Sequence, residues 1–499
     1  MTASYLIQNL PALLVVIPLL VAAVVTLVPV PAFAWVISLA AVGASFVIAL
    51  LLHSVTLTGV EISYYLGNWE PPWGIEFVVD SASSMTLVIM MGLAFVATLA
   101  ARHLIAAEIA MADCGKTYAA WLLVCGGLSG LVMTADAFNL FVFLEISALS
   151  SVILIAMGAG TDRRSLIAAF NYLIIGAVGA TFYVIGIGFV YAVTGTLNMA
   201  DLATRLPEIE HSIVIFVGFG FMIAGILVKA AVFPVHIWLP AAYSYAPSAV
   251  SVLLAAIATK ASIYVLARLI FTVFGGFADM IGAALTMVII PLSVMGIFVG
   301  TIMAIYESDI KKLLAQSSIA QIGYITLGFG LASKAGVAAG FIHIGNHALI
   351  KGGLFMAVAG FFTAMRSRVD LNSLTGMGHR MPITATAFVI CGLSLIGLPL
   401  TAGFISKLYL VRAMLETDSY LLVAIVLASS ALSLIYLWKI IEVMWMQPAA
   451  HDAPKLVENP AVYMPLWMLA GLNLWFGIDA SWMVTSAQAA AKALIGAGL

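Results

Sequence analysis

The chain has 499 residues, of which 64% are hydrophobic and 8% are charged, and its formal net charge is −2. Because soluble domains carry roughly 25% charged residues, this composition predicts an all-α polytopic membrane protein without a sizeable soluble domain. The small net charge excludes a nucleic-acid partner. The three cysteines are scattered and form no CxxC pair, so they suggest neither a disulfide framework nor a metal or Fe–S site.

Apolar runs of about 20 residues set the expected helices. The N-terminal stretch MTASYLIQNL has no Lys or Arg and lacks a signal-peptide n-region, so the first apolar run should remain as a helix. About 14 transmembrane helices are predicted, with spans at 5–29, 33–53, 77–101, 117–134, 137–158, 165–194, 212–233, 248–273, 278–304, 312–332, 337–364, 384–412, 420–446 and 460–482.

The distribution of Lys and Arg predicts the orientation. An even number of helices puts both termini on one side, and with the termini outside, 11 cations face the cytoplasm and five face outward. The 11 are Arg102, Lys116, Arg163, Arg164, Lys311, Lys312, Arg366, Arg368, Arg380, Lys439 and Lys455, and the five are Arg205, Arg268, Lys334, Arg412 and Lys492. We therefore expect a multi-pass protein of the cell (cytoplasmic) membrane with both termini outside.

Four lysines remain that cannot reach a loop. A charge at the bilayer centre costs about 2.5–3.5 kcal/mol on insertion scales, so these groups must be paired, hydrated or neutral. The four are Lys229, Lys260, Lys351 and Lys407. Glu145, which lies nine residues past Asp136 and therefore about 13 Å into a helix, is the only carboxylate expected near the bilayer centre. It is the obvious partner for one of the lysines, while Asp136 at the span end is expected to cap the helix.

Two predicted helices are interrupted. In the seventh, Pro234 follows Lys229 by five residues and His236 follows the break; in the twelfth, Pro399 lies between Gly397 and Gly403, ahead of Lys407. Interrupted helices five spans apart indicate an internal repeat, and an odd number of helices in each unit makes the repeat inverted. His236 is either a proton entry group or an interfacial residue.

This reasoning divides the chain into four parts. Residues 1–110 hold helices 1–3, residues 111–275 the first repeat of helices 4–8, residues 276–447 the inverted second repeat of helices 9–13, and residues 448–499 helix 14. The match between the repeats is imperfect, because helix 10 carries Gln316, Ser317, Ser318 and Gln321 where helix 5 carries a carboxylate.

The eleventh helix carries a polar stripe. His343, His347 and Lys351 follow one another at i, i+4 and i+8 and share one face, with Asn346 beside them. A metal site on the two histidines is disfavoured because no third ligand is present. A desolvated lysine beside a movable carboxylate can be loaded with a proton and released, and histidine titrates near neutrality. We therefore predict a proton relay, with no cofactor and no metal, along a row of groups inside the membrane: Glu145, Lys229, Lys260, His343, His347, Lys351 and Lys407. The alternative for a single buried lysine is a role in packing.

Several motifs carry a family resemblance. They are FNLFVFLEISALSS, LVKAAVFPVHIWLPAAYSYAPSAVSVLLAAIATK, SDIKKLLAQSSIAQIGY, HALIKGGLF and LSLIGLPLTAGFISKLYL. The chain resembles the antiporter-like subunits shared by respiratory complex I, membrane-bound hydrogenases and Mrp-type multisubunit antiporters, and looks most like the D-type subunits of the Mrp group. The resemblance implies a Glu145–Lys229 pair, Lys260 as the connecting lysine, relay histidines at His343 and His347, and Lys407 as the terminal site.

The expected function is that of a proton-translocating subunit of a multisubunit monovalent cation (Na⁺)/H⁺ antiporter. Its partners would be other membrane subunits, H⁺, Na⁺ and the bilayer. The alternative is an antiporter-like pump subunit of a complex I-like NADH-quinone oxidoreductase or membrane-bound hydrogenase, where the chain would be part of a translocase. A third reading is a standalone transporter or inorganic-carbon uptake partner. Two features favour the Mrp D type. One is Lys407, and the other is that the chain ends soon after helix 14.

Overall fold

The computed structural model describes residues 2–27, 30–209, 212–449 and 456–496, so Lys455 of the orientation count lies outside it. Within these ranges the chain is almost entirely helical, and 12 helices are long and apolar enough to cross a membrane. The prediction of an all-α polytopic membrane protein is thereby confirmed. Two expected spans fall outside the 12: the span 312–332, which is rich in polar residues, and the span 384–412, which is broken into two short helices.

The N-terminal part contains a small β-hairpin that the apolar pattern of the sequence does not indicate. Its elements are α1 (Thr2–Leu27), α2 (Pro31–Thr56), β1 (Ile62–Tyr65), β2 (Glu76–Val79) and α3 (Ser81–Glu108). The strands pair antiparallel, so the third helix begins at Ser81 and not at the expected residue 77. Asp80 sets this start, since its Oδ1 accepts from the backbone N–H groups of Ala82 and Ser83, at 2.9 Å each.

The first expected repeat is a run of helices with one break. It comprises α4 (Cys114–Met133), α5 (Ala137–Ala156), α6 (Arg164–Thr194), α7 (Met199–Arg205), α8 (Ile213–Ala230), α9 (Trp238–Tyr245) and α10 (Ser248–Arg268). The cap expected at Asp136 is confirmed, because its carboxylate accepts from Asn139 N–H at 2.6 Å. The break in the seventh span lies between α8 and α9, where Ala231 is left-handed with φ +56°.

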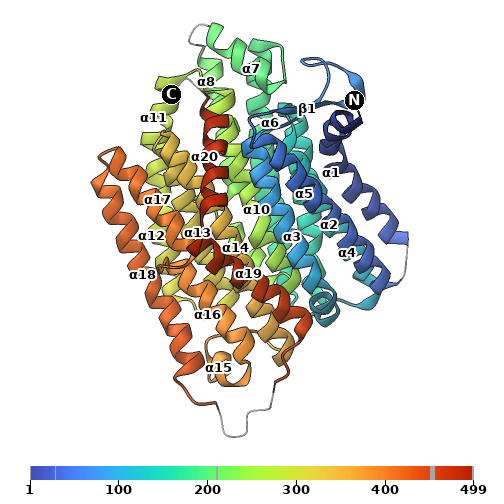
Figure 1. Cartoon of the computed structure of the whole chain (residues 1–499), viewed down its shortest axis with the longest axis vertical. Helices are drawn as coiled ribbons and strands as arrows, with labels where there is room; N and C mark the ends of the chain where they lie inside the picture. Colours follow the sequence, from blue (N-terminus) through green and yellow to red (C-terminus); the bar gives the residue numbers. More distant parts are fainter. Residues whose placement is uncertain (1, 28–29, 210–211, 450–455, 497–499) are drawn as a thin grey trace.

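The second expected repeat also contains one broken span. It comprises α11 (Ala278–Ala284), α12 (Ile290–Tyr306), α13 (Ile310–Gly330), α14 (Lys334–Met365), α15 (Met377–Arg380), α16 (Pro382–Ile396), α17 (Ala402–Glu416) and α18 (Tyr420–Trp445). The break between α16 and α17 begins at Gly397, whose φ of +92° suits glycine. Successive spans reverse direction, so α4 and α12 enter the bundle from opposite faces (Figure 1).

The fourteenth span extends further than the expected 460–482. It consists of α19 (Pro460–Ile478) and α20 (Ser481–Ile495), with a break at Asp479 and Ala480. Asp479 starts the second piece, because its carboxylate accepts from Ser481 N–H at 3.0 Å. Figure 1 shows α20 continuing to the upper face, where α1 begins. The central helices α10 and α14 are buried along nearly their whole lengths, and they carry the candidate site.

Candidate functional site

The first part of the candidate site is an ion pair between α5 and α8. Lys229 Nζ lies 3.5 Å from Glu145 Oε1, and the two side chains are 5% and 28% exposed. Lys229 lies in the last turn of α8, where the unpaired carbonyls of a helix end favour a cation. A Cβ on Gly176 of α6 would lie 3.3 Å from Lys229 Nζ. The sequence-based pairing of Glu145 with a buried lysine therefore has the geometry of an ion pair.

Lys260 occupies the middle of α10. It is 1% exposed, and its Nζ donates a hydrogen bond to the Ala255 carbonyl of its own helix. It is close enough to interact electrostatically with His343, His347 and Lys351 across the α10–α14 contact. No carboxylate accompanies Lys260 among the ion pairs of the described residues. A backbone carbonyl of its own helix thus holds this amine.

The polar stripe on α14 is buried throughout. The rings of His343 and His347 are parallel within 7°, with centroids 6.2 Å apart. His343 Nδ1 lies 2.8 Å from Ser406 Oγ, and Nε2 lies 3.0 Å from Gln321 Oε1. Neither ring nitrogen of His347 has a hydrogen-bond partner in the described part of the chain. His347 can therefore exchange a proton without first breaking a protein hydrogen bond.

Lys351 extends the stripe toward α13. Its Nζ donates to the Leu314 carbonyl at 2.8 Å and to the Ser317 hydroxyl. Both acceptors belong to α13, which corresponds to α5, the Glu145 helix, in the expected repeat. In this correspondence α13 offers a hydroxyl and a carbonyl, whereas α5 offers a carboxylate. Lys351 is 0% exposed. Within the described part of the chain, these two acceptors of its amine are both neutral.

Lys407 closes the row inside the second broken span. Its Nζ donates to the last two carbonyls of α16, Leu395 at 3.1 Å and Ile396 at 2.7 Å. It also lies 5.1 Å from the ring centroid of Tyr324 on α13. The carbonyl end of a helix carries partial negative charge, which stabilises the ammonium form. The break between α16 and α17 therefore exposes the carbonyl groups that hold the Lys407 ammonium.

The structure pairs Glu145 with Lys229, groups Lys260, Lys351 and Lys407 with the two histidines of α14, and adds two connecting side chains. Ser406, next to Lys407 in sequence, binds His343 and so joins the twelfth span to the stripe. Ser406 and Tyr324 were not expected, because serine and tyrosine are common in membrane helices. Pro234 and Pro399 lie exposed in the two breaks. His236 is half-buried and stacks on Phe233, with ring centroids 5.3 Å apart.

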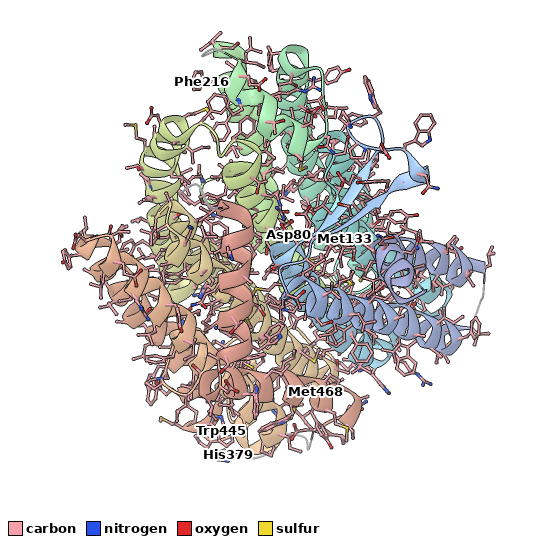
Figure 2. The ribbon with its side chains drawn as sticks, turned by 45° about the horizontal axis from the view of Figure 1, so that its top comes forward. Asp80, Met133, Phe216, His379, Trp445 and Met468 are labelled. Carbon is pink, nitrogen blue, oxygen red and sulfur yellow. The ribbon has the colours of Figure 1, made fainter. Side chains whose placement is uncertain are left out.

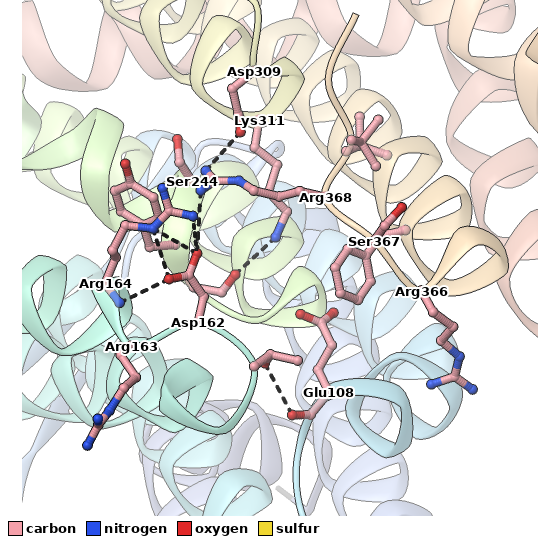
Figure 3. A pocket seen from close by; sticks show the side chains of 16 residues that line it. Glu108, Asp162, Arg163, Arg164, Ser244, Asp309, Lys311, Arg366, Ser367 and Arg368 are labelled. Atoms are coloured by element: carbon pink, nitrogen blue, oxygen red, sulfur yellow. Dashed lines mark hydrogen bonds and ion pairs between the residues drawn. The ribbon is translucent and has the colours of Figure 1, made fainter. Parts of the chain in front are cut away.

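A separate cavity opens at the face that carries the expected cytoplasmic cations. Its volume is about 440 Å³ (Figure 3). Asp162 contacts Arg164 at 2.7 Å and Arg368 at 3.4 Å, and Asp309 lies 2.8 Å from Arg368. The hydrogen bonds from Arg164 hold the pKa of Asp162 below its usual range. Tyr245 lies between the two guanidinium groups, at 4.8 and 4.7 Å from its ring. The cavity joins loops of the two expected repeats.

The row consists of groups that can exchange protons. Each charged member has a hydrogen-bonding or ionic partner, or lies within reach of one, and lysine and histidine both bind protons reversibly. In the described ranges, no group of three or more His, Cys, Asp or Glu side chains is arranged to hold a metal ion.

Comparison with known proteins supplies the family. Residues 134–433 match the family described as NADH:quinone oxidoreductase/Mrp antiporter, TM. The chain is 40% identical over 452 residues to NADH-quinone oxidoreductase subunit N of Desulforudis audaxviator, covering 89% of the chain and 88% of the relative. It is 30% identical over 445 residues to the D-type Na(+)/H(+) antiporter subunit of Alkalihalophilus pseudofirmus, covering 88% and 87%.

Solved structures agree. A chain of the Mrp complex from Dietzia sp. DQ12-45-1b superposes with a TM-score of 0.88 at 25% identity, and a chain of the membrane-bound sulfane sulfur reductase with 0.88 at 28%, each pair covering 98% of both chains. A chain of Thermus thermophilus complex I shares the fold with a TM-score of 0.74 at 22% identity, over 96% and 99%. The chain therefore belongs to the NADH:quinone oxidoreductase/Mrp antiporter transmembrane family.

Proposed function

We propose that this chain is the proton-translocating membrane subunit of a multisubunit monovalent cation (Na⁺)/H⁺ antiporter. The observation that carries the proposal is the set of titratable groups inside the helix bundle: the Glu145–Lys229 pair, and the buried group of Lys260, the α14 stripe and Lys407. Burying several charges in a membrane protein has a large free-energy cost, and such residues normally mark an ion pathway. The similarity to an Mrp complex chain over 98% of the sequence supports the same assignment.

In this proposal protons enter from the cytoplasmic side, reach Lys229, and pass through Lys260 and the two histidines to Lys407, with Lys351 at the α13 end of the stripe. Glu145 sets the proton affinity of Lys229, because an adjacent carboxylate stabilises the ammonium form. When the pair separates, the lysine releases its proton to the row. Na⁺ is the expected counter-ion of the assembled complex.

The two breaks would serve as hinges or half-channel sites. Pro234 and Pro399 interrupt the helices that carry Lys229 and Lys407, and His236 would take up protons beside the first break. Support comes from their positions, since all three lie in or next to the non-helical segments 231–237 and 397–401. Irregular backbone at membrane depth is tolerated where it lines a polar cavity or is covered by protein.

We also propose the orientation and the division of the chain. Both ends would lie outside the cell membrane, because the opposite face carries the arginine-rich cavity and most of the loop cations. Residues 111–275 and 276–447 would be the two inverted units, flanked by 1–110 and 448–499. The opposite directions of α4 and α12 support this division.

The test is transport by Glu145→Ala and Lys229→Ala variants in membranes that contain the whole complex. Both substitutions should abolish Na⁺-coupled H⁺ movement while the chain still inserts, because each removes one member of the pair. Lys312→Ala is the matched control: it removes a lysine that forms a 2.7 Å ion pair with Glu307 at a loop. Normal antiport in both test variants, at equal expression, would exclude the proposal.

One observation favours a second candidate function. The 40% identity to an NADH-quinone oxidoreductase subunit N exceeds the 30% identity to a D-type antiporter subunit. The chain would then be the antiporter-like pump of a complex I-like or hydrogenase-like redox complex. Mass spectrometry of the subunits that co-purify with the chain separates the two: quinone-reductase or hydrogenase subunits favour the redox complex, and antiporter subunits favour the first proposal.

A further inference from the structure

A second polar column leaves the row along α10. Lys260, Tyr264 and Arg268 follow one another at i, i+4 and i+8, so they share one face of a helix that is buried along nearly its whole length. Tyr264 is 3% exposed, and the Arg268 side chain is 14% exposed. Directly after Arg268 the helix widens into a π-helical turn over Leu269–Val273. The column therefore runs from the centre of the row toward the expected outer face.

Arg268 closes the upper end of this column. Its guanidinium donates to the Tyr264 hydroxyl at 2.7 Å and to Asp80 Oδ2 at 2.6 Å. Asp80, labelled in Figure 2, lies where β2 of the hairpin passes into α3. Its other carboxylate oxygen caps that helix, so the anion is fixed and holds Arg268 over Tyr264. The guanidinium thus stands between Tyr264 and the outer surface.

Two further carboxylates lie on the hairpin above Arg268. Glu61, which is exposed, interacts electrostatically with Asp80 and Arg268, and burial of part of its carboxyl raises its pKa. Glu76 Oε2 accepts from Asn198 Nδ2 at 3.2 Å. The outer side of the arginine therefore has acceptors for a released proton and an alternative anion toward which the guanidinium can turn.

We propose that Arg268 is an outer gate on a branch of the proton row, held closed by Asp80 and joined to Lys260 through Tyr264. This inference rests on the proposed proton-translocating function. A fixed arginine in a membrane pathway repels cations and protons, so the closed pair prevents protons outside from reaching Lys260 along α10. Opening requires the guanidinium to leave Tyr264 for Glu61. A purely structural pair would only fasten α3 to α10.

The test measures passive proton leak through the complex, purified with its partner subunits and reconstituted in liposomes containing a pH-sensitive dye. An imposed pH gradient without Na⁺ drives the leak. Arg268→Gln should raise the leak by about tenfold because the positive barrier is gone, and Arg268→Lys should keep it low. Arg205→Gln is the matched control, since Arg205 also pairs with an aspartate (Asp201, 2.8 Å) at the same face but lies on α7. Its leak should equal that of the wild type.

Second variants separate a gate from structural damage. Adding Tyr264→Phe or Lys260→Met to Arg268→Gln should return the leak to the wild-type value, because each breaks the column below the gate. Arg268→Gln with Asp80→Asn, which avoids an unpaired buried anion, should leak like Arg268→Gln alone. An unchanged leak in this neutral pair, or a leak that Tyr264→Phe does not close, overturns the gate. If either of these results is found while Lys229→Ala still abolishes transport, the gate is excluded and the proposed proton-translocating function stands.

Discussion

At the scale of single residues, the buried cations are held by different kinds of acceptor. Lys229 has a carboxylate, Lys260 a carbonyl of its own helix, Lys351 a carbonyl and a hydroxyl, and Lys407 the carbonyl end of a half-helix. A carboxylate favours the charged form more strongly than a neutral acceptor does. The four lysines of the row therefore differ in the charge of the groups that hold them.

Ser317→Ala tests the hydroxyl that holds Lys351. Hydrogen bonds to charged groups contribute about 1.5–3 kcal/mol, so coupled proton transport should slow by roughly one order of magnitude or more. Transport by the reconstituted complex checks this. Ser45→Ala on α2 is the matched control, because the buried Ser45 hydroxyl donates to the Ala41 carbonyl of its own helix, outside the row. Equal rates in the two variants would show that the Ser317 contact with Lys351 is unimportant.

Gly176→Ala tests the space around Lys229. The added Cβ would lie 3.3 Å from Lys229 Nζ, so the amine must shift away from α6 and its contact with Glu145 should change. We expect transport to fall by several-fold, on the order of 1 kcal/mol in the barrier, with normal insertion. Gly188→Ala on the same helix meets no atom within 4 Å and should transport normally. Wild-type transport in Gly176→Ala would contradict a tightly set pair.

The sequence identifies the charged members of the site but not their partners. Lys229, Lys260, Lys351, Lys407 and Glu145 could be found because charges are rare at membrane depth. Ser406, Tyr324 and the carbonyls of α16 could not, because hydroxyl and aromatic residues are common in membrane helices and carbonyls belong to every residue. The role of His236 stays a prediction.

At the scale of elements, the broken helices determine where cations can bind. Gly and Pro marked the breaks in the seventh and twelfth spans, and both are present in the structure. The third break, at Asp479 and Ala480, contains neither residue. Its second helix, α20, begins where the Asp479 carboxylate accepts a hydrogen bond from Ser481 N–H. The β1–β2 hairpin could not be predicted either, since its strands have only four residues each. Short elements without glycine or proline leave too weak a pattern.

Gly403→Ala tests the packing at the second break. Its Cβ would lie 1.7 Å from the Ser394 carbonyl oxygen, so α16 and α17 must separate. Because a backbone atom cannot move aside cheaply, we expect a loss of about 3 kcal/mol or more and little folded protein. Size-exclusion of the detergent-solubilised chain measures this. Gly471→Ala on α19 meets nothing within 4 Å and should behave like the wild type, and a normal yield of Gly403→Ala would count against this packing.

At the scale of the whole molecule, the two expected units meet in a buried row and again at the cavity face. The order of the spans could be predicted, and 12 of the 14 expected spans match helices of the described residues that are long and apolar enough to cross a membrane, because 20-residue apolar runs are a strong signal. Which helices occupy the centre could not be read from apolar length alone. The polar residues of α13 and α14 indicated it, since helices that carry such residues must turn them away from lipid.

Asp162 tests the ion pairs at the cavity, where it contacts Arg164 of its own expected unit and Arg368 of the other. Arg164 lowers the folded-state pKa of Asp162, so the ion pair contributes stability at pH values above about 4 that is lost as pH falls through the folded-state pKa. Asp162→Asn should lower the thermal midpoint at pH 7 by about 1–2 °C, a small effect because the pair is partly exposed. The difference should shrink progressively as the pH falls below about 4. Asp113→Asn is the control, because it removes an exposed ion pair with Lys116 that lies away from the cavity. A difference between Asp162→Asn and the wild type that does not change with pH would contradict the ionic explanation.

The central claim is that the row carries protons between the two units, and Lys260 is the residue through which they must pass. The most direct measurement is coupled H⁺ transport by the reconstituted complex carrying Lys260→Met, with the presence of every subunit checked on the same sample. Transport should be lost while all subunits remain assembled. Wild-type transport in the intact Lys260→Met complex would contradict it.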